Sequence, residues 1–128
     1  MRLLLDTHIL LWALTDDPQL TLSVRELLLD PRNDVFFSAA SVWEIAIKRT
    51  LRKSAIPLSA ENATRLFRDA GYEELAVSAD HAARVETLPP LHSDPFDRIL
   101  VAQALSEPMR LITHDRVVAS YNSEIILI

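Results

Sequence analysis

The chain of 128 residues has no cysteine and only one glycine. The absence of cysteine excludes disulfides, thiolate metal sites and cysteine nucleophiles, and it suits a reducing compartment. No apolar run reaches the roughly 18 residues that a membrane-spanning helix requires. The first residues also lack the apolar segment and cleavage site of a secretory signal. We therefore expect a cytoplasmic protein with no membrane span.

An excess of basic residues is also absent, because the formal net charge is -5 at pH 7. This charge argues against a broadly basic surface that holds duplex DNA. It does not exclude a nuclease, because carboxylates that hold cations contribute to the negative total. One basic cluster is predicted on a single helical face: Lys48, Arg49, Arg52 and Lys53. A solvated helix end that suits the helix dipole is the simpler interpretation, and a phosphate-contacting patch is the alternative.

Short apolar runs alternate with helical patterns along the whole chain. Strands are expected at residues 3–6, 34–38, 74–78, 110–114 and 124–128. Helices are expected at residues 7–14, 23–29, 41–52, 59–71, 80–88, 94–107 and 116–120. This alternation predicts one α/β domain over residues 1–128, with a parallel central sheet of about four to five strands sandwiched between helices.

Local signals mark where several helices begin and end. The serine-to-glutamate spacing of a capping box occurs at residues 23–26 and 41–44. Gly71 is placed to end one helix, and Asp94 with Pro95 is placed to begin another. We expect Asp94 to act as this helix cap rather than as a metal ligand.

Four acidic residues recur next to strand ends or helix starts: Asp6, Glu44, Asp97 and Asp115. Taken singly, each is explained by helix capping or by the helix dipole, and a cap contributes ~0.5 to 2 kcal/mol. Their joint pattern suggests more, because ligands of open α/β sheets bind outside the carboxyl ends of the strands. We expect the four carboxylates to face one cleft.

Clustered carboxylates of this kind should bind protons or a cation. Two unit charges about 4 Å apart repel by roughly 4 kcal/mol at an effective dielectric of about 20. Oxygen ligands without cysteine favour Mg²⁺ or Mn²⁺ over Zn²⁺. Carboxylate-held Mg²⁺ is a usual means of activating water against a phosphodiester. Zinc is disfavoured because no histidine pair has the spacing of a zinc motif.

Several polar residues near these acids have open roles. Thr7 and Thr113 either orient carboxylates or water, or form ordinary caps and turns. Whether His8 or His92 takes part in the site is left open. For Arg98 we expect an ion pair with a neighbouring acid, with phosphate binding as the alternative.

Two tryptophans lie on apolar helical faces. We expect Trp12 and Trp43 to belong to the core, although an exposed edge of either ring would be able to stack on RNA bases.

Four stretches, in this order, span nearly the whole chain and carry a family resemblance: "LLLDTHILLW", "SAASVWEIAIK", "LHSDPFDRILVAQA" and "LITHD". On these stretches the chain resembles the PIN-domain family, and specifically the VapC-type toxins of toxin-antitoxin pairs. The second and third stretches together are quite specific. The usual "GK" after the Glu44 helix is here "LRKS", which puts the loop geometry in question and not the acids.

The resemblance implies a metal-dependent endoribonuclease. Together with the acid pattern, it leads us to expect Mg²⁺- or Mn²⁺-dependent cleavage of single-stranded or looped RNA. It assigns the catalytic and metal-binding quartet to Asp6, Glu44, Asp97 and Asp115, with Thr113 as a polar neighbour. It also implies neutralisation by a small antitoxin and a homodimeric state.

Two alternatives remain at the level of sequence. A catalytically silent RNA- or protein-binding module would suit the acidic net charge and the 49% apolar fraction. An aspartyl-phosphate phosphatase would need a second aspartate two residues after Asp6, where this chain has His8.

Overall fold

The computed structural model describes residues 1–52 and 56–128. Five parallel strands form one sheet in the order β3-β2-β1-β4-β5. The strands are β1 (Arg2–Leu5), β2 (Asp34–Ser38), β3 (Glu73–Leu75), β4 (Arg110–Thr113) and β5 (Ile126–Leu127). The predicted α/β class with a parallel sheet is confirmed.

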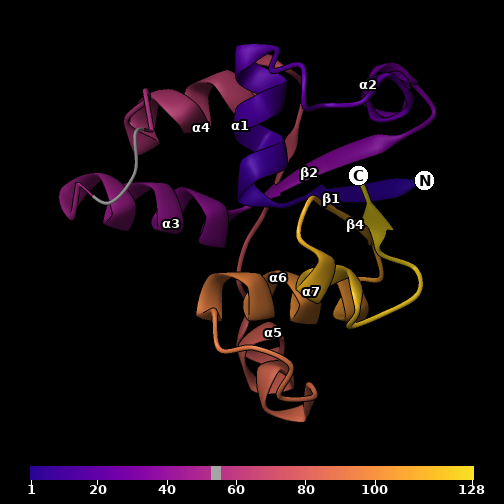
Figure 1. Ribbon diagram of the computed structural model, residues 1–128. Helices are drawn as coiled ribbons and strands as arrows, with labels where there is room; N and C mark the ends of the chain where they lie inside the picture. Colours follow the sequence, from indigo (N-terminus) through magenta and orange to yellow (C-terminus); the bar gives the residue numbers. More distant parts are fainter. Residues whose placement is uncertain (53–55) are drawn as a thin grey trace.

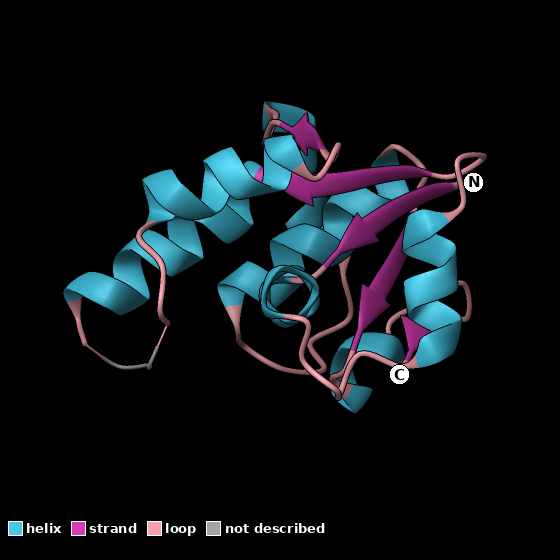
Figure 2. Ribbon diagram, turned by 90° about the horizontal axis from the view of Figure 1, so that it is seen from above, coloured by secondary structure: helices cyan, strands magenta, loops and turns pink. Residues whose placement is uncertain are grey.

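Helices cover both faces of the sheet. Figure 1 shows α1, α2 and α4 above the strands and α5, α6 and α7 below them. The helices are α1 (Thr7–Thr15), α2 (Leu22–Leu29), α3 (Ala39–Thr50), α4 (Ala60–Asp69), α5 (Ala79–Arg84), the 3-10 helix η1 (Val85–Thr87), α6 (Pro95–Ser106) and α7 (Arg116–Ala119). Figure 2 shows α3 and α4 extending together to one side of the sheet. Across residues 1–52 and 56–128, every helix is too short or too polar to cross a membrane.

Leu3, Leu4 and Leu5 of the central strand β1 are fully buried because both faces of the strand pack against apolar side chains. Leu3 and Leu5 belong to the cluster that includes residues of α1 and α4, such as Phe67. Leu4 belongs to the opposite cluster, with residues of α6 such as Leu100. This alternation follows the two-residue period of a strand, and it explains why β1 is a continuous apolar run.

The two predicted capping boxes are wrong. Thr21 caps α2 instead of the serine at position 23, because its hydroxyl accepts a hydrogen bond from the Val24 amide. Strand β2 continues directly into α3, so its last residue, Ser38, is the cap of that helix. The predicted position of Glu44 in the first turn is therefore also wrong, and Glu44 lies in the second turn.

The predicted basic helical face is interrupted. Helix α3 ends at Thr50, and Arg52 has a positive φ of 52°, which takes it out of the helix. Arg52 therefore does not share a helical face with Lys48. Lys53 and Ser54, the second half of the "LRKS" departure, lie outside the described residues.

The predicted end of α4 and start of α6 are confirmed. Gly71 follows α4 with φ of 87°, its amide donates to the Arg68 carbonyl, and the Tyr72 amide donates to the Phe67 carbonyl. These two hydrogen bonds form a Schellman motif. At the start of α6, Asp94 Oδ1 accepts from the Phe96 and Asp97 amides.

Gly71→Ala should destabilise the protein by about 1 kcal/mol, because alanine is strained at positive φ. No neighbouring atom lies within 4 Å of the added Cβ, so steric clash contributes nothing further. Gly71→Asn is the matched control and should lose less, because asparagine tolerates this conformation. Urea denaturation measures both variants, and an unchanged midpoint for Gly71→Ala would show that the helix end is dispensable.

Candidate active site

An acid-lined cavity of about 440 Å³ lies at the carboxyl edge of the sheet. Its acidic lining residues come from four separate parts of the chain: Asp6, Glu44, Asp94, Asp97 and Asp115. The other lining residues are Thr7, His8, Trp12, Lys48 and His114. All four acids singled out from the sequence therefore share this cavity, while Thr113 lies buried behind Asp6.

Asp6 is both a helix cap and a cavity residue. Its Oδ1 accepts from the Ile9 amide at 3.0 Å, and its Oδ2 accepts from Thr113 Oγ1 at 2.5 Å. Burial raises the pKa of Asp6 above its ordinary value and the charge of Glu44 adds to the rise, while both hydrogen bonds oppose it. The two sequence-based interpretations of Asp6, cap and site residue, are therefore compatible.

Glu44 is held by partners on both of its oxygens. Thr7 Oγ1 donates to Oε1 at 2.6 Å and lies 3.0 Å from Ser41 Oγ, while Lys48 Nζ contacts Oε2. Only 5% of Glu44 is exposed. The glutamate thus points inward from the second turn of α3 as a buried carboxylate with hydrogen-bond partners. Of the two roles that the sequence left open for Thr7, the structure shows the orientation of a carboxylate.

Asp97 is a second acid in the cavity whose pKa is raised, and it pairs with a histidine. Its Oδ2 lies 3.1 Å from His92 Nε2, and His92 Nδ1 lies 2.8 Å from the Tyr121 hydroxyl. Burial raises the pKa of Asp97 to about 6, the charges of Asp94 and Asp6 raise it further, and the His92 hydrogen bond opposes the rise. The cavity therefore holds more negative charge than its own cations balance.

Asp94 and Asp115 also combine capping with a place in the cavity. Asp94 caps α6, and Asp115 Oδ1 accepts from the Val117 amide at 2.8 Å to cap α7. The Asp115 amide in turn donates to Thr113 Oγ1 at 3.0 Å. Thr113, the last residue of β4, therefore contacts both Asp6, which follows β1, and Asp115.

Two sequence-based expectations about side chains near the cavity are wrong. Arg98 donates to the carbonyls of Pro89 and Val85 and to the Tyr121 hydroxyl, and it forms no ion pair within the described part of the chain. Trp43 is 59% exposed and packs edge-on against Phe96, because it faces outward from α3. Arg98 of α6 thus holds the segment before α6 in place through hydrogen bonds to its carbonyl groups.

Lys48 and Trp12 also line the cavity. The sequence did not predict this place for Lys48, and it left open whether an edge of Trp12 is exposed. Lys48 was assigned to a basic helix end, although its position four residues after Glu44 is the spacing at which helical side chains meet. Trp12 packs against the core as expected, and its ring also meets His114 edge-on at 5.0 Å at the cavity.

The donor atoms in the cavity fit a hard divalent cation. They are carboxylate oxygens, and burial, together with the charges of Asp94 and Asp6, raises the pKa of Asp97. Within residues 1–52 and 56–128, however, no three histidine, aspartate or glutamate side chains are placed as ready ligands of one ion. The donor chemistry of the site therefore matches Mg²⁺ or Mn²⁺, ions that proteins commonly hold with one or two carboxylates and water.

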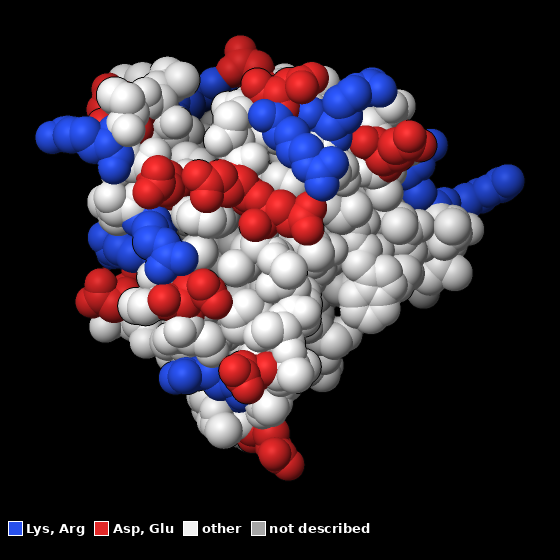
Figure 3. Space-filling model, turned by 180° about the vertical axis from the view of Figure 1, so that it is seen from behind, with Lys and Arg blue, Asp and Glu red and all other residues white. Residues whose placement is uncertain are grey.

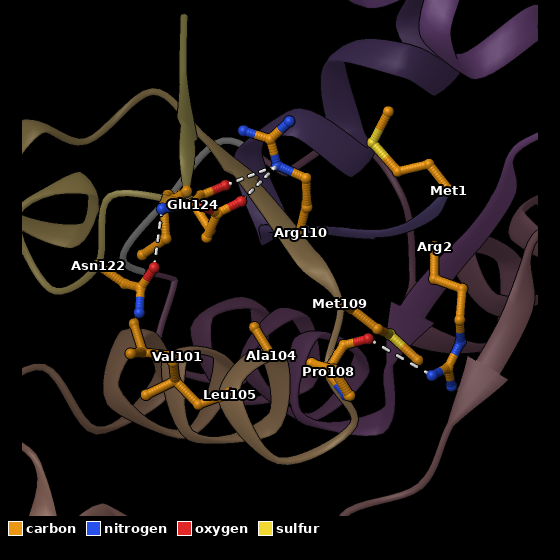
Figure 4. Close-up of a pocket in the computed structure, with 11 residues that line it drawn as sticks. Met1, Arg2, Val101, Ala104, Leu105, Pro108, Met109, Arg110, Asn122 and Glu124 are labelled. Carbon is orange, nitrogen blue, oxygen red and sulfur yellow. Dashed lines mark hydrogen bonds and ion pairs between the residues drawn. The ribbon is translucent and has the colours of Figure 1, made fainter.

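A second hollow, of about 580 Å³, has a different character and lies at the opposite ends of the strands. Figure 4 shows Val101, Ala104 and Leu105 of α6 beneath Arg110 and Glu124. The Arg110 Nε donates to the Glu124 carbonyl at 2.8 Å. In this hollow Arg110 pairs with Glu124, and much of the remaining lining is apolar. The acid-lined cavity is therefore the better candidate for chemistry on a phosphodiester.

On the face of the molecule drawn in Figure 3, the charges agree with the sequence-based argument against a broad DNA-binding surface. Figure 3 shows acidic and basic side chains lying side by side, with a large uncharged area beside them.

Comparisons with known proteins agree with the geometry. The family model described as "PIN domain" matches residues 3–123. The structure of VapBC2 from Rickettsia felis bound to a promoter DNA fragment has a TM-score of 0.71 at 19% identity, over 100% of this chain and 98% of that one. The DNA-bound VapBC from Salmonella typhimurium has a TM-score of 0.66 at 16% identity, over 100% and 97% of the two chains.

A toxin-antitoxin complex from Klebsiella pneumoniae is also similar, with a TM-score of 0.64 at 19% identity, over 96% of this chain and 94% of that one. No curated protein sequence matches the chain. At these identities the structural likenesses show a shared fold.

Asp97→Asn should raise the stability of the metal-free protein at pH 7. The folded-state pKa of Asp97 is about 6 against an ordinary value of 3.8, so the folded protein binds this proton more tightly than the unfolded chain does. Stability is therefore lost as the pH rises from about 4 to about 6. Asparagine removes the charge and keeps an oxygen for His92, so we expect a gain of about 1 to 2 kcal/mol.

Urea denaturation in the presence of a chelator measures this gain at pH 7 and at about pH 4, where it should nearly vanish. Asp34→Asn, at the exposed amino end of β2, is the matched control and should change stability little at either pH. A loss of stability at pH 7 for Asp97→Asn would show that the carboxylate serves mainly as a structural acceptor.

Proposed function

Because the chain belongs to the PIN-domain family, we propose that it is a divalent-metal-dependent endoribonuclease that hydrolyses phosphodiester bonds in RNA. One observation carries the proposal: carboxylates from four separate segments line one cavity at the carboxyl edge of a parallel sheet. This edge is where open α/β folds bind their ligands. The proposed catalytic and metal-binding residues are Asp6, Glu44, Asp97 and Asp115, with Thr113 as a positioning residue.

The roles of these residues follow from their contacts. Mg²⁺ or Mn²⁺, when bound, supplies an activated water and stabilises charge on the phosphate. Thr113 fixes the Asp6 carboxylate by donating to Oδ2, and Thr7 fixes Glu44 by donating to Oε1. His92 orients Asp97 through Oδ2. The chain thus holds its carboxylates in place before a cation arrives, which lowers the reorganisation needed at the reaction step.

RNA fits this site better than duplex DNA. The acidic cavity and the net charge of -5 offer few cations for the many phosphate contacts that a duplex-binding surface makes. A single strand or a loop needs fewer phosphate contacts and exposes its bases to aromatic side chains. The Trp43 ring lies outside the acid cavity and is 59% exposed on α3, which leaves it available for stacking by a base of a bound single strand.

A second candidate, a catalytically silent RNA- or protein-binding module, is favoured by one observation. Among the described residues no three potential ligands are already placed around one ion position. Calorimetric titration with Mg²⁺ and Mn²⁺ separates the candidates, because a silent module would take up neither ion at millimolar concentration.

Asp6→Asn and Asp97→Asn should each lower the rate of RNA cleavage in Mn²⁺ by at least about 100-fold, because each removes a charged ligand of the proposed metal. Structured RNAs of known sequence, resolved on gels after incubation with purified protein, provide the measurement. Asp34→Asn makes the same chemical change far from the cavity and should cleave at the wild-type rate. Full cleavage by both cavity variants would refute the assignment.

We also propose that the chain is the toxin of a toxin-antitoxin pair, neutralised by a small antitoxin, and that it forms a homodimer. The structural relatives are VapBC and toxin-antitoxin complexes, which supports an antitoxin partner. An apolar hollow of about 510 Å³ that includes exposed Trp43 and Val77 offers a surface for self-association.

Induced expression of the chain in bacteria should arrest growth, and expression of Asp97→Asn at an equal protein level should not, because arrest is expected to require cleavage. Growth that continues under the wild-type chain would contradict the toxin assignment. Sedimentation equilibrium tests the dimer, and a monomer mass at micromolar concentration would contradict it.

A further inference from the structure

Lys48 is the only lysine or arginine among the described residues that line the acid cavity, and it shares that cavity with five acidic residues. It lies one helical turn after Glu44 on α3, and its Nζ contacts Glu44 Oε2. The pair is not an ordinary surface salt bridge, because only 7% of the Glu44 side chain is exposed. Removing the lysine would leave a buried carboxylate with Thr7 as its remaining side-chain donor.

The ammonium group of Lys48 contacts Glu44, which is also one of the proposed metal ligands. Asp94 and Asp97 lie close enough for their charges to act on the Lys48 ammonium group as well as on each other. A divalent ion that uses Glu44 as a ligand would share this carboxylate with the ammonium group of Lys48. Two cations that share one carboxylate repel each other, so the binding of one should weaken the binding of the other.

The lysine has a route out of the cavity. Its side chain is 33% exposed, and its flexible four-carbon stem can carry the ammonium group toward solvent. The neighbouring Arg49 is exposed and donates to the Ile56 carbonyl, so it does not line the cavity. The two basic residues are therefore adjacent in sequence and different in environment.

We propose that Lys48 is a built-in counter-cation, which neutralises Glu44 in the metal-free protein and competes with the divalent ion for that carboxylate. This inference rests on the proposed metal binding and adds a residue that tunes it. Lys48 keeps the metal-free site folded, and it lowers the affinity of the site for the ion that displaces it.

Titration calorimetry with Mn²⁺ on the full chain tests the competition. Lys48→Met should bind Mn²⁺ more tightly than the wild type by on the order of tenfold, because even part of the repulsion between charges a few ångström apart is enough for such a change. Lys48→Arg keeps the charge and should stay near the wild-type affinity. Arg49→Met removes the same charge one residue away and should change affinity less than about twofold.

Thermal unfolding provides a second measurement that does not depend on catalysis. Without metal, Lys48→Met should unfold at a lower temperature than the wild type, and saturating Mn²⁺ should raise its midpoint by more than it raises that of the wild type. If Lys48→Met does not fold, Lys48→Gln takes its place, because glutamine removes the charge and can still donate to Glu44.

The outcomes separate this inference from the proposed function. If the wild type binds Mn²⁺ and cleaves RNA while Lys48→Met and Lys48→Gln bind no more tightly, the lysine is not a competitor and the function stands. Weaker binding by these variants would show that Lys48 instead orients Glu44 for the metal. If neither the wild type nor any Lys48 variant binds Mn²⁺, the proposed metal-dependent function and the competition both fail.

Discussion

Like-charged carboxylates held together in a partly buried cavity are the constraint on which the rest of this structure depends. Asp6 and Glu44 are almost fully buried, and the pKa of Asp97 is raised to about 6 by burial and by neighbouring acids. Such an arrangement is unfavourable in an apoprotein unless each charge finds hydrogen bonds or a counter-cation. The elements around the cavity supply these partners.

Three kinds of partner share this task. Helix amides bind the aspartates that cap α1, α6 and α7, and they place positive dipole ends at the cavity. Thr7 and Thr113 donate from buried hydroxyls, and His92 approaches Asp97 from the segment before α6. Lys48 provides a full positive charge. Because these groups come from separated segments, the parallel sheet is what brings them to one edge.

The sequence was sufficient to predict the sheet and the gathering of the acids, because both follow from strong local signals. A buried parallel strand reads as a continuous apolar run, and the residue that follows it must lie at the carboxyl edge of the sheet. That rule placed Asp6 and Asp115 correctly without any alignment. Asp94 and Gly71 were equally predictable, because helix caps depend on a few neighbouring residues.

The errors occur where long-range packing decides between local alternatives. Spacing alone could not show that β2 runs straight into α3, which moves the cap to Ser38 and turns Glu44 inward toward Thr7. It could not show that Arg98 is taken up by distant carbonyls and Tyr121, or that Trp43 faces outward. The contact between Lys48 and Glu44 was visible as a four-residue spacing, but its burial in the acid cavity was not.

A crystal structure of the wild-type protein grown with Mn²⁺, with anomalous data, tests the central claim most directly. The account predicts an anomalous peak in the acid cavity, about 2.1 Å from oxygens of at least two of Asp6, Glu44, Asp97 and Asp115. A well-ordered cavity with no peak at millimolar Mn²⁺, or a peak bound only elsewhere on the protein, would contradict it.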